Sequence, residues 1–521
     1  MKTYSSVETV SYNNYYLPES TTANINNGVG VTTTTLEYLH NAGGNGKDYY
    51  IGRPSSKKVV NQAYGQTITA YDTYSYENNL VASKKVYDRN ISNFIKETYN
   101  YDGFGNIKEK TIVSSEDANT RTVKTEYDSQ GKFVLKEIDN LGLVTSMTYN
   151  NWGQLLTEID PFGNKVTNTY DAWGKILTSN TNLTGTTTYT YEKDSNGNFK
   201  TTEYSPSGNY GIKYVNRLGQ EYKTSSKGFN QGRIISKEIV YDAIGRKIKE
   251  SEPYFEGESQ KWNTLTYNDD FFPAVISVHS ELTDKKMTTK LVGMVTTVKE
   301  DNGYGRTTSQ ETDALGNVIR SSDPGGSVVF TYNPVGQQLS ATYGSNVVTT
   351  KYDHWGRKAE FHDPSNGTYK YTYNGFGDPI NFESPKGLKS YAYNPKGQLA
   401  KQIEIAHDGS TAKDITFSYN TKGQLTKRTG TAKNIKGTLD TYSSSATYDP
   451  QGRLVESGEI SNGRYFMQKG ITYDDKGRIT SYEKSLYSGG QYTKALIENV
   501  YDTWSGALYQ LKDKNSGAIL W

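Results

Sequence analysis

Two histidines and two pairs of adjacent carboxylates are the residues that could perform acid–base or metal chemistry. His354 and His362 each adjoin an aspartate, and an imidazole beside a carboxylate can act as a general base or bind a metal. Both lie at or beside turn positions, where variable polar residues are common. The pairs at 269–270 and 474–475 would point to opposite faces of a strand, which is a poor arrangement for shared acid–base work. We find no phosphate-binding glycine loop, nucleophile elbow or metal-ligand spacing, and predict no catalytic, cofactor or metal site.

The elements that position these residues are recurring turns. The motif Tyr-(Asp/Asn)-x-x-Gly occurs twelve times, and between Tyr332 and Tyr393 its steps are 20, 21 and 20 residues. Looser copies lie halfway between the strict ones, so that two steps of 10 or 11 residues make one unit. The copies begin at Tyr101, Tyr127, Tyr149, Tyr170, Tyr241, Tyr332, Tyr352, Tyr373, Tyr393, Tyr419, Tyr448 and Tyr473.

Each letter of the motif suits a tight hairpin turn. Asp or Asn accepts hydrogen bonds from backbone amides further along, and glycine at the fourth turn position can take a positive φ. Proline occupies the second position in eight turns, as its fixed φ favours, counting Pro364 in a turn one residue longer. We expect positive φ at Gly356, Gly377, Gly397 and Gly452. The predicted structural turn residues are Tyr101, Asp102, Gly105, Tyr170, Asp171, Gly174, Tyr241, Asp242, Gly245, Tyr352, Asp353, Gly356, Tyr373, Asn374, Gly377, Tyr393, Asn394, Gly397, Tyr448, Asp449, Gly452, Tyr473, Asp474 and Gly477.

Six or seven residues remain between turns, which is a usual strand length. They alternate: Tyr369, Tyr371 and Tyr373 share one face, and Lys370 and Thr372 the other. The pattern predicts an all-β, long antiparallel meander of hairpins. A meander of some forty strands must curl, close or coil, and we predict a sheet that spirals on itself.

Composition favours a thin, polar sheet over a packed globule. The 521 residues include 45 Tyr, 50 Gly and no Cys, and the hydrophobic fraction is 34%. A net charge of +2 without a basic block gives no case for nucleic acid. No apolar run is long enough for a membrane span, and no signal peptide is visible in residues 1–20.

These motifs resemble the RHS/YD-repeat family, whose YDxxGR form is close to residues 241–246 and 352–357. The family includes bacterial toxin-complex proteins, RHS toxins and teneurins. The resemblance implies a hollow β-shell, and in the bacterial members a toxic C-terminal segment inside it. We expect this chain to be an open fragment of such a shell.

Four stretches of one continuous architecture are predicted. Residues 1–98 carry degenerate repeats, 99–252 and 306–521 carry YD-repeat shell, and 253–305 carry atypical repeats. The first of these includes a Gly/Asn-rich loop.

The resemblance also directs attention to Asp-Pro-x-Gly, which occurs at Asp160, Asp323 and Asp449. In RHS toxins, paired copies of this motif cut the chain. None of these three has a second copy about twenty residues on, and each sits in a turn of the repeat, so we assign no self-cleavage residues.

The sequence therefore predicts a non-catalytic structural fragment that encapsulates a C-terminal toxin or effector absent from this chain. Its expected partners are the missing remainder of the shell and the cargo, and its expected location is secreted or cell surface. The alternative is an extracellular adhesion or glycan-binding module that uses cell-surface receptors or glycans. The tyrosine row could stack on sugar rings, although we interpret it as cross-strand stacking that supports the sheet.

Overall fold

The computed structural model describes residues 5–229, 232–434, 436–461 and 463–521. This part of the chain contains 43 β-strands, one short 3-10 helix η1 (Gly46–Asp48) and no α-helix. The first half of the strands are β1 (Ser6–Tyr12), β2 (Pro18–Ile25), β3 (Gly30–Asn41), β4 (Tyr50–Ala63), β5 (Gln66–Glu77), β6 (Leu80–Tyr87), β7 (Phe94–Tyr101), β8 (Ile107–Ser114), β9 (Asp117–Tyr127), β10 (Val134–Ile138), β11 (Val144–Tyr149), β12 (Leu155–Ile159), β13 (Lys165–Tyr170), β14 (Ile176–Thr181), β15 (Gly185–Lys193), β16 (Phe199–Tyr204), β17 (Tyr210–Val215), β18 (Glu221–Lys227), β19 (Ile234–Tyr241), β20 (Lys247–Ser251), β21 (Tyr254–Phe255) and β22 (Trp262–Asn268).

The remaining strands continue at similar length to the end of the chain. They are β23 (Val275–Ser280), β24 (Lys285–Val292), β25 (Val295–Glu300), β26 (Thr307–Thr312), β27 (Val318–Asp323), β28 (Gly326–Tyr332), β29 (Gln338–Tyr343), β30 (Asn346–Tyr352), β31 (Lys358–Asp363), β32 (Gly367–Tyr373), β33 (Pro379–Ser384), β34 (Gly387–Tyr393), β35 (Leu399–Ala406), β36 (Thr411–Tyr419), β37 (Leu425–Lys433), β38 (Leu439–Tyr448), β39 (Leu454–Ser461), β40 (Arg464–Tyr473), β41 (Ile479–Ser488), β42 (Gln491–Tyr501) and β43 (Leu508–Asp513).

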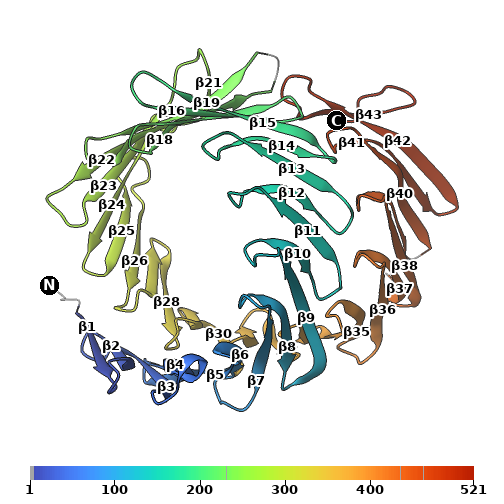
Figure 1. Cartoon of the computed structure of the whole chain (residues 1–521). Coiled ribbons are helices and arrows are strands. Elements are labelled where there is room, and N and C mark those ends of the chain that lie inside the picture. Colours follow the sequence, from blue (N-terminus) through green and yellow to red (C-terminus); the bar gives the residue numbers. More distant parts are fainter. Residues whose placement is uncertain (1–4, 230–231, 435, 462) are drawn as a thin grey trace. The chain divides into compact units, whose positions relative to one another are not determined.

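Strands pair antiparallel with their neighbours in sequence, as β11 to β14 illustrate (Figure 1). An exception surrounds the two-residue strand β21, which pairs with β19 while β20 pairs with β22. Within β32, Tyr369, Tyr371 and Tyr373 are half-buried while Lys370 and Thr372 are exposed, as the alternation predicts. The predicted all-β meander is therefore confirmed.

A β-bulge recurs where a strand enters the motif turn. The pairing register shifts between Lys351 and Tyr352, and again between Thr372 and Tyr373. A bulge adds one residue to one strand and leaves backbone groups out of the regular ladder. The motif tyrosine thus marks a fixed irregularity of each repeat.

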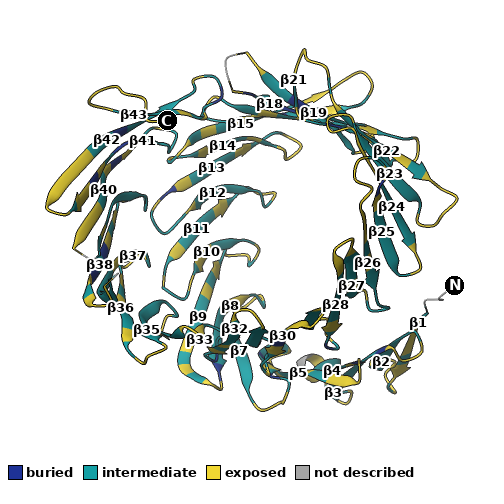
Figure 2. Cartoon of the chain, turned by 180° about the vertical axis from the view of Figure 1, so that it is seen from behind, coloured by how far each residue is buried: buried dark blue, intermediate teal, exposed yellow. Residues whose placement is uncertain are grey.

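The sheet has little enclosed core. One small cluster of buried residues is formed by Ile471, Tyr482 and Ile497, and most strands are only half-buried (Figure 2). The accessible surface is 30558 Å², whereas a packed monomer of this mass would expose about 19,000 Å². Most residues are therefore stabilised by contacts within and along the sheet.

Two compact units can be distinguished. Unit 1 comprises residues 1–132, 289–299 and 304–412. Unit 2 comprises residues 133–288, 300–303 and 413–521. Each unit therefore contains two long runs of the meander that are far apart in sequence. We call residues 1–132 and 133–288 the first runs of units 1 and 2, and residues 304–412 and 413–521 their second runs.

The two ends of the strands carry different turns. We call the turns at the end where the motif recurs YD turns, and those at the opposite end return turns. The four stretches predicted from the sequence remain a prediction, and residues 1–4 of the first lie outside the described residues. No helix in the described ranges is long and apolar enough to cross a membrane.

Candidate functional site

Four hydrogen bonds close a YD turn, as the turn at Asp171 shows. The Asp171 amide donates to the Lys175 carbonyl over 2.8 Å, and the Gly174 amide donates to the Asp171 carbonyl over 3.1 Å. Asp171 Oδ1 accepts the amides of Trp173 at 2.9 Å and Lys175 at 2.8 Å. The first and fourth residues therefore do the work that the motif predicts for them. The same backbone closure occurs at Asp102, Asp242, Asp353, Asn374, Asn394, Asp449 and Asp474.

The fourth residue needs a backbone conformation that glycine adopts without strain. The values of φ are +81° at Gly356, +90° at Gly377, +81° at Gly397 and +84° at Gly452. The positive φ expected at these four glycines is confirmed.

The fifth residue of the turn was not recognised from the sequence, yet it is matched to the first. Where the first residue is Asp and the fifth is Arg, the fifth side chain donates: Arg246 Nε lies 2.8 Å from Asp242 Oδ2. Where the first is Asn, the fifth accepts: Asn150 Nδ2 donates to Gln154 Oε1 over 2.7 Å. A carboxylate only accepts hydrogen bonds, whereas an amide also donates them, so Asp and Asn at the first position need different fifth residues. The Asp-with-donor pairs include Asp102–Asn106, Asp194–Asn198, Asp353–Arg357, Asp449–Arg453 and Asp474–Arg478, and the Asn-with-acceptor pairs include Asn216–Gln220, Asn333–Gln337, Asn374–Asp378, Asn394–Gln398 and Asn420–Gln424.

In many repeats the motif tyrosine joins its hairpin to the preceding one through its hydroxyl, although the Tyr149 hydroxyl instead donates to Met147 Sδ. Tyr373 donates to the Lys358 carbonyl at 2.9 Å, and Tyr393 to the Pro379 carbonyl at 2.8 Å. Lys358 is the bulge partner of the previous motif tyrosine, Tyr352. The expected role of tyrosine in supporting the sheet therefore includes a hydrogen bond as well as ring packing. The same bond is made by Tyr101, Tyr170, Tyr241, Tyr267, Tyr332, Tyr352, Tyr448, Tyr473 and Tyr501.

Arginine at the fifth position makes three contacts at once. Besides pairing with Asp474, Arg478 lies 4.1 Å from the ring centre of Tyr501 and donates through Nη1 to the Gly506 carbonyl at 3.1 Å. Arg357 likewise reaches Asn374 and Tyr373 of the next repeat. This residue therefore connects one YD turn to the next.

These bonds shift the pKa values of the groups that make them. The hydrogen bond from the Arg246 side chain lowers the pKa of Asp242. Burial alone would raise the pKa of Asp474, but the Arg478 backbone amide and side chain outweigh it and the pKa is lowered. Burial raises the pKa of Tyr373, and the negative charge of Asp353 raises it further.

The candidate chemical residues are not brought together. His362 Nδ1 lies 3.0 Å from Thr368 Oγ1, and His354 lies in a YD turn. The paired carboxylates lie in turns rather than on opposite faces of a strand, which corrects that expectation, and Asp269 pairs with Arg246. Among the described residues, no group of three or more potential metal ligands of the His, Cys, Asp and Glu types is found.

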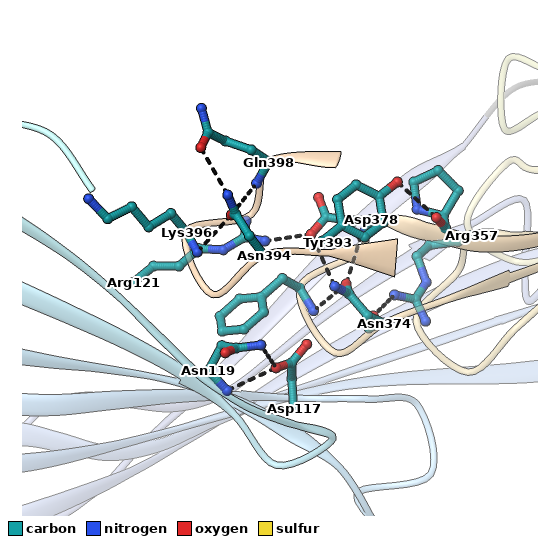
Figure 3. Close-up of polar contacts among 12 residues, drawn as sticks. Asp117, Asn119, Arg121, Arg357, Asn374, Asp378, Tyr393, Asn394, Lys396 and Gln398 are labelled. Atoms are coloured by element: carbon teal, nitrogen blue, oxygen red, sulfur yellow. Dashed lines mark hydrogen bonds and ion pairs between the residues drawn. The ribbon is translucent and has the colours of Figure 1, made fainter. Parts of the chain in front are cut away.

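In unit 1, return turns of the first run contact YD turns of the second run. The Arg121 guanidinium pairs with Asp378 at 2.5 Å and lies 4.2 Å from the ring centre of Phe376 (Figure 3). Trp355 Nε1 donates to Glu116 Oε2 over 2.8 Å. We call such a turn-to-turn interface a seam. Its partners are about 250 residues apart, so the sequence pattern gave no sign of it.

Unit 2 has a seam of the same kind. Asn164 Nδ2 donates to the Gln451 carbonyl over 3.0 Å. Trp504 Nε1 donates to the Arg233 carbonyl over 3.3 Å, and the Lys227 ammonium lies 4.2 Å from the Trp504 ring centre. In both units, the third residue of the YD turn reaches across the seam.

Comparisons with known proteins agree with this geometry. A family model described as RHS Repeat matches residues 127–165. No curated protein matches the chain. A crystal structure of TcdB2–TccC3 is similar over 98% of this chain and 38% of that chain, with a TM-score of 0.65 and 12% identity.

Two further solved structures give the same result. TcdB2–TccC3 without its hypervariable C-terminal region has 11% identity, a TM-score of 0.65 and coverage of 98% of this chain and 40% of that chain. The Tc holotoxin pore of Photorhabdus luminescens has 11% identity, a TM-score of 0.64 and coverage of 98% and 39%. The chain thus spans about two fifths of the length of these proteins. The family resemblance expected from the motifs is confirmed.

Proposed function

This chain carries an RHS repeat and has the fold of TcdB2–TccC3, and from this we propose that it is a non-catalytic structural strip of a β-shell that encloses a polypeptide cargo. The observation that carries the proposal is the similarity over 98% of the chain to a protein in which it would account for only 38%. A strip of this size would need the remainder of a shell to enclose anything. Its partners would be that remainder and the cargo.

The local contacts suit a wall. Tyrosine hydroxyls and arginine side chains connect many hairpins to the next, and the seams connect distant runs of the meander within each unit. A small buried core is compatible with this role, because hydrogen bonds along the strip stabilise the sheet in place of a thick hydrophobic core.

A structural role also accounts for the residues that could have performed chemistry. Asp160 and Asp449 of the Asp-Pro-x-Gly copies use their side chains within their own turns, accepting from Asn164 and Arg453. One relative is described by a hypervariable C-terminal region, which is the kind of segment a shell would hold. We propose that the chain acts as part of a secreted or cell-surface protein.

Protease protection tests this function. In the full-length protein that carries this chain, the cargo segment should resist a protease concentration that digests the same segment expressed alone. Denaturant that opens the seams should remove the protection. Digestion of the segment at equal rates in both settings would contradict encapsulation.

A further inference from the structure

The third residue of the YD turn occupies two different environments. In the second runs, Leu315, Trp355, Phe376 and Trp504 are half-buried against return turns of the first runs. In the first run of unit 2, four of the equivalent residues are large, apolar and exposed, whereas Asn196 in the turn at Asp194 is polar. Their exposed fractions are 88% for Trp152, 90% for Trp173, 75% for Leu218 and 75% for Ile244. We call these four the tryptophan rim.

The two seam tryptophans show what this turn position does when it is covered. Trp355 donates its indole N–H to a carboxylate, and Trp504 donates to a backbone carbonyl, each in a return turn. No hydrogen bond from the indole of Trp152 or Trp173 is present within the described part of the chain. The rim therefore presents the indole donors and apolar surface that a seam uses, but no return turn covers it within the described part of the chain.

A groove of about 650 Å³ lies between the two rim tryptophans. Its polar lining is already used: Asn150 and Asp171 accept turn amides, and Gln154 donates to the Gly174 carbonyl at 2.9 Å. A sugar needs several free polar partners beside an aromatic face. The groove offers two indole rings beside a mixed polar and apolar surface whose named polar side chains are engaged in their own turns, an arrangement that suits a protein turn.

A complementary surface is present on the same chain. The return turns of the second runs are exposed in both units, for example at Ser365 and Asn366, at His407 to Gly409, and at Asn515 and Ser516. They supply small residues and oxygen acceptors, as the return turns of the seams do. Exposed Lys175 and Arg217 beside the rim match the exposed carboxylates Asp323 and Asp408 of return turns.

We propose that the tryptophan rim binds the return turns of a second copy of this chain, so that copies associate head to tail through a repetition of their own seam. The two free turn surfaces of one chain are the two kinds that already meet inside each unit. The contact is heterologous, with different surfaces on the two copies. It does not depend on the presence of a cargo.

Sedimentation equilibrium of the purified chain tests the proposal. The wild type should self-associate with rising concentration, and Trp152→Ala/Trp173→Ala should weaken association at least about tenfold, as loss of two interface anchors implies. Tyr304→Ala is the matched control, since Tyr304 is 83% exposed but lies outside the rim. A chain that stays monomeric, association that is equally affected by Tyr304→Ala or unaffected by the double variant, or a longer protein carrying this chain that stays monomeric because the rest of its shell covers the rim, overturns the proposal.

Amine cross-linking of mixed isotope-labelled and unlabelled copies identifies the surfaces that meet. Links between copies should join Lys175 to lysines of return turns, such as Lys386 or Lys514. Links that join only Lys175 to Lys175 would mean that two rims face one another, and the head-to-tail arrangement would be wrong.

Discussion

At the scale of single residues, the first and fifth positions of a YD turn form a matched donor–acceptor pair. The first side chain uses Oδ1 for two backbone amides, so only its second terminal atom is left for a partner. That atom is an acceptor in Asp and a donor in Asn. A change at one position therefore has a predictable remedy at the other.

Asp474→Asn should destabilise the chain by about 1 kcal/mol at neutral pH, because it sets an amide donor against the Arg478 guanidinium at the surface. Adding Arg478→Gln recreates the Asn–Gln pairing found at Asn150 and Gln154, and should recover most of the loss. Denaturant unfolding and hydrogen exchange of the Lys476 amide measure both steps. Equal instability of the single and double variants would refute the pairing rule.

The same pair has a pH dependence with a defined sign. The pKa of Asp474 is lower in the folded chain than in the unfolded one. Its stabilisation is therefore complete above the unfolded value of about 3.9 and declines as the pH falls through the folded value. The double variant has no carboxylate at 474 and should lose this part of its acid sensitivity.

At the scale of elements, a turn that lies in a seam is more constrained than the same turn outside one. Gly375 and Gly103 both occupy the second turn position in unit 1. A Cβ added at Gly375 would lie 2.2 Å from Ser114 Oγ, whereas a Cβ at Gly103 would meet nothing within 4 Å. The difference comes from the opposing return turn and not from the turn itself.

Gly375→Ala should therefore lower the free energy of unfolding by about 1–3 kcal/mol through overpacking, whereas Gly103→Ala should change it by less than about 0.5 kcal/mol. Urea denaturation of the two variants gives the comparison. Combining Gly375→Ala with Ser114→Gly should restore part of the loss. Similar effects at both glycines would show that the seam does not support the turn.

The sequence predicts the strands and YD turns but not the contacts between distant elements. Strands and YD turns follow from neighbouring residues, because alternation, Asp/Asn and glycine act within one hairpin. The tyrosine hydroxyl bond was missed, since its acceptor carbonyl becomes available only through the bulge in the previous repeat. The seams were missed because pairs such as Arg121 and Asp378 have no local signature. The pairing of the first and fifth residues could have been predicted from the sequence, since a possible donor follows Asp and a possible acceptor follows Asn in every strict motif.

At the scale of the whole molecule, the tyrosines set an upper pH limit. Burial is the main cause that raises the pKa of the hydroxyl-bonding tyrosines Tyr101, Tyr332, Tyr352, Tyr373, Tyr393 and Tyr473. A phenolate cannot donate to a carbonyl, so each ionisation removes one bond between hairpins. Because the bond recurs along the chain, its loss weakens many hairpins together.

We expect full stability below the unfolded tyrosine pKa of about 10 and a steep loss as the pH rises through the higher folded values. Phenolate absorbance and far-ultraviolet circular dichroism, followed together, should change in one transition above pH 10. Complete phenolate formation near pH 10 with the β-sheet signal intact would contradict a stabilising role for these hydroxyls.

The seams also limit how the gene can change in length. Tandem repeats readily gain or lose copies, and a meander by itself would accept one hairpin more or less, since each strand pairs with its sequence neighbours. Here, however, Asn164 must meet Gln451, and Arg121 must meet Asp378. An extra hairpin inserted between such partners would displace every later turn by one place along the opposing row. These contacts, between residues that no single repeat contains, therefore oppose the gain or loss of a repeat between the partners.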